Sequence, residues 1–281
     1  EIGEAVTTAI VAAPASDFSD AEITRLRDWL TNDGKLGRNL MVVVNSLATS
    51  KDCPNLYEFL DDGYQIEVTD NLVVETDDNR NLMGYNGQLN GDLPESPVSS
   101  AAAEGGVLSG NPRQILLKAG TDTEQTLYNI PLVTFPESSR IVPLGGTDDD
   151  QRQADSYPIT GMGMAVNWTY DNSGEESVLV QTNVVVCNQG MVVDTMATIA
   201  GNQTLSLIDA NSGNETVMMD IMNYINGNED SVTISGKSLT ANTSLDLSAG
   251  VANVLGIVLT IVLPVGLLII CLVVFLRRRH L

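Results

Sequence analysis

The sequence contains a single histidine, His280, which follows the last apolar run of the chain. A Ser-His-Asp triad, a Cys-His dyad and a catalytic zinc site with histidine ligands are therefore excluded from the main part of the chain. There is no Walker A sequence, which excludes ATP hydrolysis through a P-loop. We predict no catalytic residue, cofactor or metal, and we expect that the protein is not an enzyme. A hydrolase that uses only Asp and Glu stays open as an alternative, although no spacing selects a carboxylate pair.

Cysteine is also scarce. Cys271 lies in the apolar run, which leaves Cys53 and Cys187 outside it, and no Cys-x-x-Cys pair exists. The two cysteines could pair in an oxidising compartment, but two buried free thiols are the favoured interpretation. Cys187 follows an apolar strand at a turn, where nucleophiles lie in some α/β enzymes. Because no histidine can activate it, a catalytic role is disfavoured.

Basic residues are few, and the chain carries a net charge of −22. All 36 acidic residues lie at or before Asp246, so the part before the final apolar run has 11 basic and 36 acidic residues, a net charge of −25. Such a surface repels nucleic acid and anionic head groups. It is typical of a soluble domain held away from the bilayer, or of one that attracts cations. The run Asp148–Asp150 lacks the spacing of a calcium-binding loop and is interpreted as a solvated charge run.

A long apolar run is present near the end of the sequence. No charged residue occurs from Leu247 to Leu276, and the densest part is 254–276. As a helix this part would span about 34 Å, against about 30 Å for the hydrocarbon core of a bilayer. A buried core helix is the weaker interpretation, because core helices are rarely apolar on all faces over this length. We predict a transmembrane anchor; its marker residues are Leu255, Pro264 with its expected kink, Leu276, and the flanking Arg277, Arg278 and Arg279.

Positive residues beside a membrane helix stay in the cytoplasm. We therefore expect a single-pass protein of the cell membrane, with the C-terminus cytoplasmic and the bulk of the chain extracytoplasmic. The sequence begins at Glu1 rather than at Met, close to an apolar stretch, and we interpret it as a fragment that lacks upstream sequence.

Strand and helix patterns alternate in the first part of the chain. Residues 5–14 predict a strand that ends at a proline, and Ser19 with Glu22 has the spacing of a capping box at the start of a helix. LMVVV at 40–44 is typical of a strand buried on both faces of a parallel sheet. These patterns predict an α/β fold with helices on the faces of the sheet. The organisation we expect is a first part of the extracytoplasmic domain (1–83), an irregular lineage-specific insert (84–160), the remainder of the domain (161–235), a stalk (236–253), the transmembrane helix (254–276) and a cytoplasmic tail (277–281).

Polar residues follow three of the predicted strands. Open α/β sheets hold ligands at the carboxyl ends of their parallel strands. We therefore predict a ligand-binding edge, for a sugar or another small molecule, formed by Pro14, Ala15, Ser16, Asn45, Ser46, Asn188 and Gln189.

Four segments resemble the GldG-type auxiliary proteins of ABC transporters. Residues 10–46, IVAAPASDFSDAEITRLRDWLTNDGKLGRNLMVVVNS, are similar to that family's strand ending in Pro, "S-x-x-E" helix, Gly and apolar strand. Residues 53–75, CPNLYEFLDDGYQIEVTDNLVVE, resemble its "pNL" helix and "x-Val-Val" strand. Residues 213–240 resemble its Gly-Asn helix followed by "I-x-x-K-S-L", and 263–281 resemble its closing proline, apolar run and arginines. The order and spacing of these motifs carry the resemblance, which covers roughly half of the chain and leaves out 84–160.

The resemblance implies a Rossmann-like or glutamine-amidotransferase-like three-layer domain without catalytic residues, plus one C-terminal transmembrane helix. It further implies a non-enzymatic auxiliary subunit of an ABC-2-type transporter in a bacterial cell envelope, with a permease, an ATPase and the lipid bilayer as partners and no nucleic acid. A cell-surface module that binds a glycan or cell-wall ligand, not tied to a transporter, is the alternative.

Overall fold

The computed structural model describes residues 2–77, 79–82, 85–98, 106–174, 176–192, 196–199, 203–206, 213–227, 260, 264 and 265. The chain divides into two compact units, residues 1–235 and 236–281. Of the predicted transmembrane helix only Thr260, Pro264 and Val265 are described, and the stalk and the tail lie outside the described residues. Within the described residues, no helix combines the length and the apolar character needed to cross a membrane.

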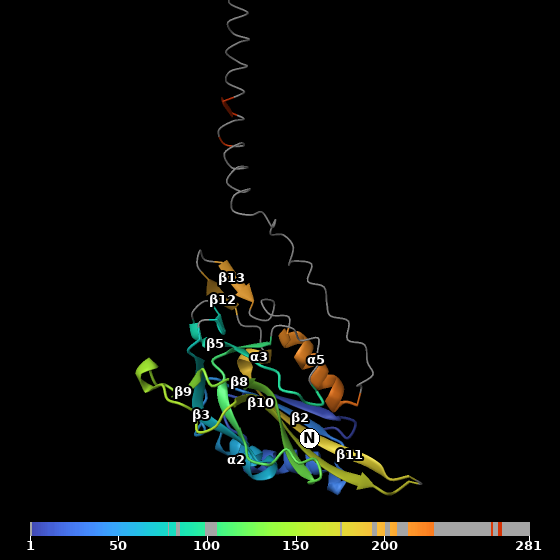
Figure 1. Cartoon of the computed structure of the whole chain (residues 1–281). Helices are drawn as coiled ribbons and strands as arrows, with labels where there is room; N and C mark the ends of the chain where they lie inside the picture. The colour runs from blue at the N-terminus through green and yellow to red at the C-terminus, as the bar shows by residue number, and fades with distance from the viewer. Residues whose placement is uncertain are drawn as a thin grey trace, which may run out of the picture. The chain divides into compact units, whose positions relative to one another are not determined.

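An eight-stranded sheet forms the centre of the first unit, in the order β1-β2-β11-β10-β7-β3-β9, with β8 paired to β10 (Figure 1). Its strands are β1 (Thr8–Ala12), β2 (Asn39–Val44), β3 (Ile66–Glu75), β7 (Arg113–Leu117), β8 (Leu127–Phe135), β9 (Ser139–Pro143), β10 (Ile159–Asp171) and β11 (Val178–Asn188). A second sheet joins β4 (Asn81–Leu82), β5 (Tyr85–Gly91) and β6 (Val107–Gly110), and a third pairs β12 (Met196–Ile199) with β13 (Gln203–Ser206).

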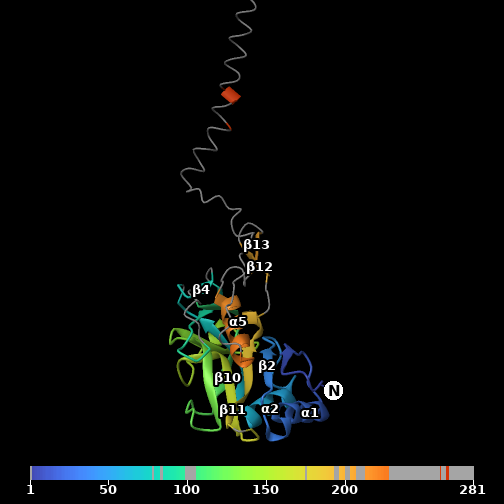
Figure 2. The same cartoon turned by 90° about the vertical axis from the view of Figure 1, so that its right-hand side faces the viewer.

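Helices cover both faces of the main sheet. The helices are α1 (Asp20–Thr31), α2 (Pro54–Tyr64), α3 (Gln189–Val192) and α5 (Gly213–Ile225), with short 3₁₀ turns η1 (Asn32–Gly34) and η2 (Asp148–Asp150). Helices α1 and α2 lie on one side of the sheet and α3 and α5 on the other (Figures 1 and 2). The predicted α/β class with helices on the faces of the sheet is confirmed.

The direction of the strands differs from a doubly wound parallel sheet. Among the described strands, only β1, β2 and β11 are mutually parallel, and all other pairings are antiparallel. The β1–α1–β2 segment is a βαβ unit, as expected, because a parallel pair needs a crossover connection. After α2, however, β3 pairs antiparallel with β7 and β9. Apolar patterning indicates burial and not direction, which is why the sequence did not reveal this change.

Region 84–160 is also not the irregular insert that the composition predicted. It contains β5 to β9, and β7 and β8 both pair with β10 in the main sheet. Gly, Asn, Ser and Pro are frequent in this region, and they interrupt the alternation of apolar and polar residues from which strands are predicted. The segment is thus part of the fold.

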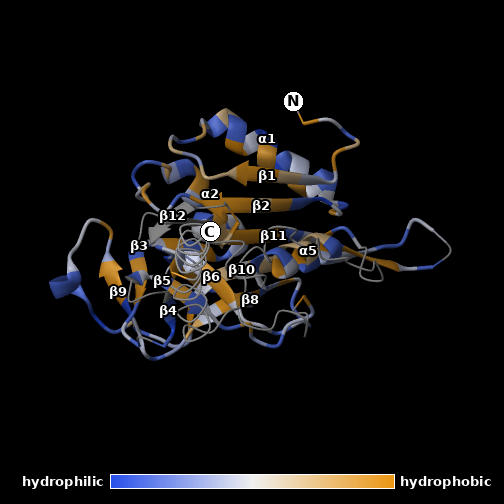
Figure 3. Cartoon of the chain, turned by 90° about the horizontal axis from the view of Figure 1, so that it is seen from above, coloured by the Kyte–Doolittle hydropathy of each residue, from blue (hydrophilic) through white to orange (hydrophobic). Residues whose placement is uncertain are grey.

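Two cores lie on opposite faces of the main sheet. Alternation sends Met41 and Val43 of β2 to the core under α3 and α5, and Leu40 and Val42 to the core under α1 and α2. The central strands are apolar on both faces for this reason (Figure 3). Each fully buried aliphatic side chain contributes about 1.5–3 kcal/mol to folding. The predicted double burial of LMVVV is confirmed.

Asparagine side chains hold both ends of α5. The amide of Asn214 exchanges hydrogen bonds with the backbone of Leu108 (N–H to Oδ1, 2.9 Å; Nδ2 to O, 2.8 Å) and donates to Met191 O at 2.9 Å. At the other end, Asn39 Nδ2 donates to Ile225 O at 2.6 Å. Because these amides are buried, each bond is made away from competing water.

Candidate functional site

The parallel strands bring the predicted ligand-binding residues to one edge of the sheet. In the register, Val43 of β2 is paired with Ala12 of β1 and with Cys187 of β11, so the three strands end level with one another. The predicted residues follow these ends directly: Pro14 and Ser16 after β1, Asn45 and Ser46 after β2, and Asn188 and Gln189 at the junction of β11 and α3. We call these six residues the carboxyl edge. Asn45 links two of the loops, because its Nδ2 donates to Ala13 O at 3.5 Å.

Asn188 differs from the other members of the carboxyl edge because its side chain is buried and engaged. Its Oδ1 accepts the N–H of Arg113 at 2.7 Å, and its Nδ2 donates to Arg113 O at 3.0 Å and to Gly161 O at 2.7 Å. These bonds fasten the end of β11 to β7 and β10. Asn188 therefore holds the edge together, and ligand contacts are left to the other members, of which Ser16 is exposed and the rest are partly exposed.

A buried arginine lies beside this edge, and the sequence reasoning missed it. The guanidinium of Arg113 donates from Nε to Thr69 O at 2.7 Å, from Nη1 to Ala48 O, and from Nη2 to Asp70 Oδ1 at 2.7 Å. Its Cζ lies 5.6 Å from the centroid of the Tyr57 ring. The signal that could have revealed it is an arginine at the start of the apolar segment RQILL. Because arginine is almost never fully buried without a partner, an arginine in a buried strand indicates a carboxylate or other acceptors nearby.

Asp70 joins this arginine to the loop after β2. Its Oδ1 accepts the N–H of Ser50 at 2.7 Å and its Oδ2 accepts the Ser50 hydroxyl at 2.6 Å. A polar cavity of about 380 Å³ opens next to the pair. Its polar lining consists of Ser50, Glu67, Thr69, Asp70, Asn71, Gln114, Arg152 and Asp155. The cavity offers donors and acceptors to a polar, uncharged or cationic ligand.

Neither cysteine outside the apolar run is placed for chemistry. Cys53 and Cys187 are buried free thiols, as expected, and they belong to different cores on opposite faces of the sheet. Burial raises the pKa of the Cys187 thiol to about 12, and burial together with the nearby Asp17 raises the pKa of Cys53. A thiolate is the reactive form of cysteine, and a raised pKa disfavours it at both positions.

The acidic run Asp148–Asp150 forms the 3₁₀ turn η2. The carboxylate of Asp150 accepts hydrogen bonds from the N–H of Thr147 at 2.8 Å and from its hydroxyl at 3.0 Å. These bonds lower the pKa of Asp150. The run therefore closes a turn on the surface. Over the described ranges, no cluster of three His, Cys, Asp or Glu side chains is placed to hold a metal ion.

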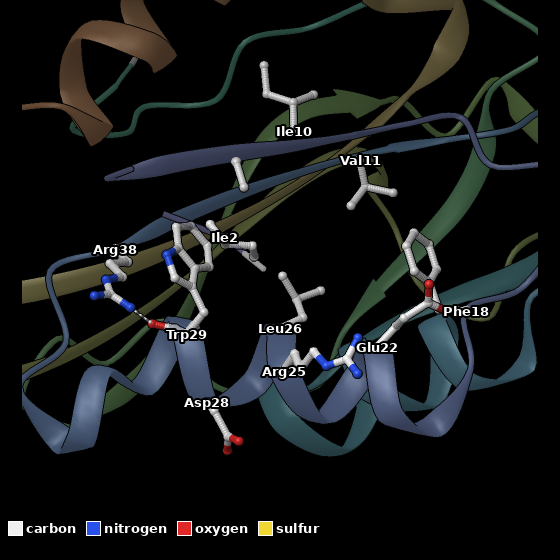
Figure 4. A pocket seen from close by; sticks show the side chains of 11 residues that line it. Ile2, Ile10, Val11, Phe18, Glu22, Arg25, Leu26, Asp28, Trp29 and Arg38 are labelled. Carbon is white, nitrogen blue, oxygen red and sulfur yellow. Dashed lines mark hydrogen bonds between the residues drawn. The ribbon is translucent and has the colours of Figure 1, made fainter. Parts of the chain in front are cut away.

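A second hollow lies between α1 and the edge strand β1, with a volume of about 590 Å³ (Figure 4). Phe18, Leu26 and Trp29 form its floor on the side of α1, while Arg25 and Asp28 point away from the strand. Ile10 and Val11 leave β1 on opposite sides. We call this hollow the β1 groove. Its full lining is Ile2, Ala9, Ile10, Val11, Phe18, Glu22, Arg25, Leu26, Asp28, Trp29 and Arg38.

The outer side of β1 is open along the groove. Thr7 O and Ala13 N bond to β2, so alternation turns the backbone groups of Thr8, Ile10 and Ala12 outward. The strand TAIVA has no charge, and the side chain of Ile10 is 56% exposed. At the opposite edge, β9 carries Arg140 and Pro143, and Arg152 bridges its outer side. Proteins commonly blunt sheet edges by such means, and among the described residues β1 has none of them.

Trp29, on the floor of the β1 groove, carries a buried polar atom. The residue is 6% exposed, and within the described part of the chain its indole N–H has no hydrogen-bond partner. Arg38 lies over the ring at 5.6 Å and donates to the backbone oxygen of Trp29 at 2.9 Å. The sequence placed Trp29 beside the apolar stripe of a helix but gave no sign of the groove, which depends on how α1 packs against β1.

Comparison with known proteins gives no relative: no family model, curated protein or solved structure matches this chain.

Proposed function

We propose that this protein is a non-enzymatic, membrane-anchored auxiliary subunit of an ABC-2-type transporter, with its folded unit outside the cytoplasm. The observation that carries the proposal is the open, uncharged edge of β1 beside an apolar groove. An extended peptide segment can add to such an edge, where main-chain hydrogen bonds supply affinity and alternate side chains enter a pocket. The occupant we propose is an extended, apolar extracytoplasmic segment of the permease.

The resemblance to GldG-type proteins supports the same function. Its first motif coincides with the β1–α1–β2 unit, and the strand and the capped helix of that motif line most of the β1 groove. In this proposal the Rossmann-like character is confined to β1, β2 and β11. The apolar run 254–276 and Arg277–Arg279 supply the membrane anchor and its orientation.

Co-purification from native membranes tests the proposal. The full chain, isolated in mild detergent, should bring down a permease and an ATPase in a defined ratio. Replacing the exposed Ile10 by Lys places a charge at the open edge and should reduce the recovered permease. Leu47→Lys is the matched control, because Leu47 is 83% exposed and lies outside the groove, and it should leave recovery unchanged. Isolation of the chain without either transporter component would count decisively against the function.

A ligand-binding module, not tied to a transporter, is a second candidate that one observation favours. The carboxyl ends of the parallel strands β1, β2 and β11 bring five polar or small residues to one edge of the sheet: Pro14, Ser16, Asn45, Ser46 and Gln189. The polar cavity at Ser50 and Asp70 lies near this edge, because Ser50 is in the loop after β2 and Arg113 bonds to both Asp70 and Asn188. A glycan or cell-wall fragment is the ligand class proposed. In a thermal-shift screen of soluble glycans, at least one glycan should then raise the melting temperature of the protein. Ser46→Tyr should abolish this shift, because the larger side chain would occupy the space for the ligand at the carboxyl edge. A screen in which no glycan moves the melting temperature rejects this candidate.

A further inference from the structure

An aromatic cavity lies at the opposite end of β11 from the carboxyl edge. The chain has only two Trp and seven Tyr, yet Tyr128, Trp168 and Tyr170 line one cavity of about 430 Å³. The other lining residues are Thr123, Glu124, Leu179 and Gln181. The β10–β11 hairpin that carries most of them extends beyond α5 (Figures 1 and 3). The cavity is therefore separate from the β1 groove and from the polar cavity at Asp70.

Strand register explains why these aromatic residues share one face. Trp168 and Tyr170 are two residues apart on β10, and their partners on β11 are Gln181 and Leu179. Tyr128 of β8 is paired with Val166, two residues before Trp168. Side chains at alternate positions of a strand point to the same face. The three rings therefore form a row on that face of the sheet.

Two of the rings stand nearly perpendicular to each other. The centroids of Trp168 and Tyr170 are 5.4 Å apart and their planes make an angle of 80°. Tyr170 is 55% exposed and Leu179 is 48% exposed, whereas Tyr128 is buried deeper in the row. The rings of Trp168 and Tyr170 both line the cavity, and the ring of Tyr170 is open to solvent there.

The loop 120–126 adds an acidic side to this cavity. Trp168 binds the loop twice, because its backbone N–H donates to Thr126 O at 3.0 Å and its indole Nε1 donates to Gln125 O at 2.7 Å. Asn129 N also donates to Gly120 O at 3.0 Å. The loop is held at both ends, and it presents Glu124 to the cavity. Because the indole N–H already donates to the loop, a ligand in the cavity can contact the aromatic ring of Trp168 but cannot accept a hydrogen bond from it.

We propose that this aromatic cavity binds a quaternary ammonium cation. The face of an aromatic ring attracts a cation within about 6 Å of its centroid, and cages of several rings are used for quaternary ammonium groups. Glu124 adds a carboxylate, and the net charge of −25 before the apolar run disfavours anions. A trimethylammonium group also has apolar methyl surface to bury against the rings, which a strongly hydrated primary ammonium lacks.

Calorimetric titration with choline tests the proposal on the full chain in phosphatidylglycerol nanodiscs, which contain no quaternary ammonium group. The matched ligand is 3,3-dimethylbutan-1-ol, which has the shape of choline without its charge. We expect choline to bind at least about tenfold more tightly than the neutral alcohol, the difference that a partly desolvated cation–π contact supplies. Equal affinity for the two ligands, or no binding of choline, would overturn the proposal.

Two substitutions locate the site. Tyr170→Ala and Glu124→Gln should each weaken choline binding by about tenfold, because one removes an exposed ring and the other a carboxylate. Glu137→Gln, an exposed carboxylate outside the cavity, is the control and should bind as the parent does. Circular dichroism confirms that each variant folds; because both changed side chains are exposed, we expect folded proteins. If both cavity variants bind choline normally while folded, the site is not here and the proposal fails.

The quaternary ammonium group can belong to a free solute or to a lipid headgroup. Flotation of the nanodisc-embedded chain with phosphatidylcholine vesicles, compared with phosphatidylglycerol vesicles, distinguishes the two sources. Tyr170-dependent flotation with phosphatidylcholine identifies a lipid headgroup. Choline binding without such flotation identifies a free solute, and absence of both overturns the proposal.

Discussion

Arg113 is the largest of the fully buried side chains described, and its guanidinium is bonded through all three nitrogens. A charge in this position is stable only while its partners are present, because the desolvation of an ion costs several kcal/mol. Asp70, its only carboxylate partner among the described residues, is partly exposed on its other side. The Arg113–Asp70 ion pair therefore connects the buried interior of the protein to the polar cavity that Asp70 lines.

Replacing Asp70 by Asn should destabilise the folded unit by about 2–3 kcal/mol, because the buried Arg113 charge loses its counter-ion. Asp61→Asn, which removes one partner of the exposed Lys118, should cost less than about 1 kcal/mol. Urea denaturation followed by circular dichroism measures both. If the two substitutions cost the same, the burial of Arg113 does not matter energetically.

The thiol of Cys187 should resist alkylation in the folded protein. Burial raises its pKa to about 12, so the thiolate is scarce throughout the range from neutral to mildly alkaline pH. Treatment with iodoacetamide at pH 8, followed by mass spectrometry, should leave Cys187 unmodified until denaturant is added. Rapid labelling under native conditions would show that the strand end opens readily.

The start of α1 depends on a charged carboxylate. Glu22 accepts hydrogen bonds from the Ser19 N–H at 2.8 Å and from the Ser19 hydroxyl at 2.7 Å, and these bonds lower its pKa below 4.5. A lowered carboxyl pKa stabilises the folded state above the unfolded pKa and loses this contribution as the pH falls through the folded pKa. The capped helix predicted from Ser19 and Glu22 is thus also a source of acid sensitivity.

Glu22→Gln should reduce the loss of stability on acidification below about pH 4.5, since the amide that replaces the carboxylate does not titrate. The urea midpoint, measured at several pH values down to pH 3, gives the comparison with the parent protein. Glu58→Gln, on the exposed side of α2, is the control. An unchanged pH profile for Glu22→Gln would mean that the cap does not contribute to this dependence.

The elements that the sequence predicted best are those whose pattern is local. The helix from Asp20, the doubly buried strand at Asn39–Val44 and the helix Gly213–Ile225 all follow from spacing within one segment. The carboxyl edge was predicted because parallel strands end at a common edge. Arg113, the β1 groove and the aromatic cavity were not predicted. Each depends on which strands become neighbours, and region 84–160 in particular shows no local sign that β7 and β8 enter the main sheet.

At the scale of the whole molecule, the distribution of charge predicts a topology. The folded unit carries all of the acidic residues except Asp246, and Arg277–Arg279 follow the apolar run. A protease that does not cross membranes should digest residues 1–235 on intact cells and leave a small C-terminal fragment protected. Immunoblotting with antibodies to each end measures the result. Complete protection of the folded unit would contradict the orientation.

Helix α5 is the last described element before residues 236–281 of the second unit. Any mechanical load that reaches the folded unit from its C-terminal side must enter through this helix. Asn214 then transmits the force to Leu108 and Met191, and Asn39 transmits it to β2, the second strand of the main sheet. Under such a load, the buried amides of Asn214 and Asn39 would share the force with the apolar contacts that Val217, Ile221 and Ile225 make in the core.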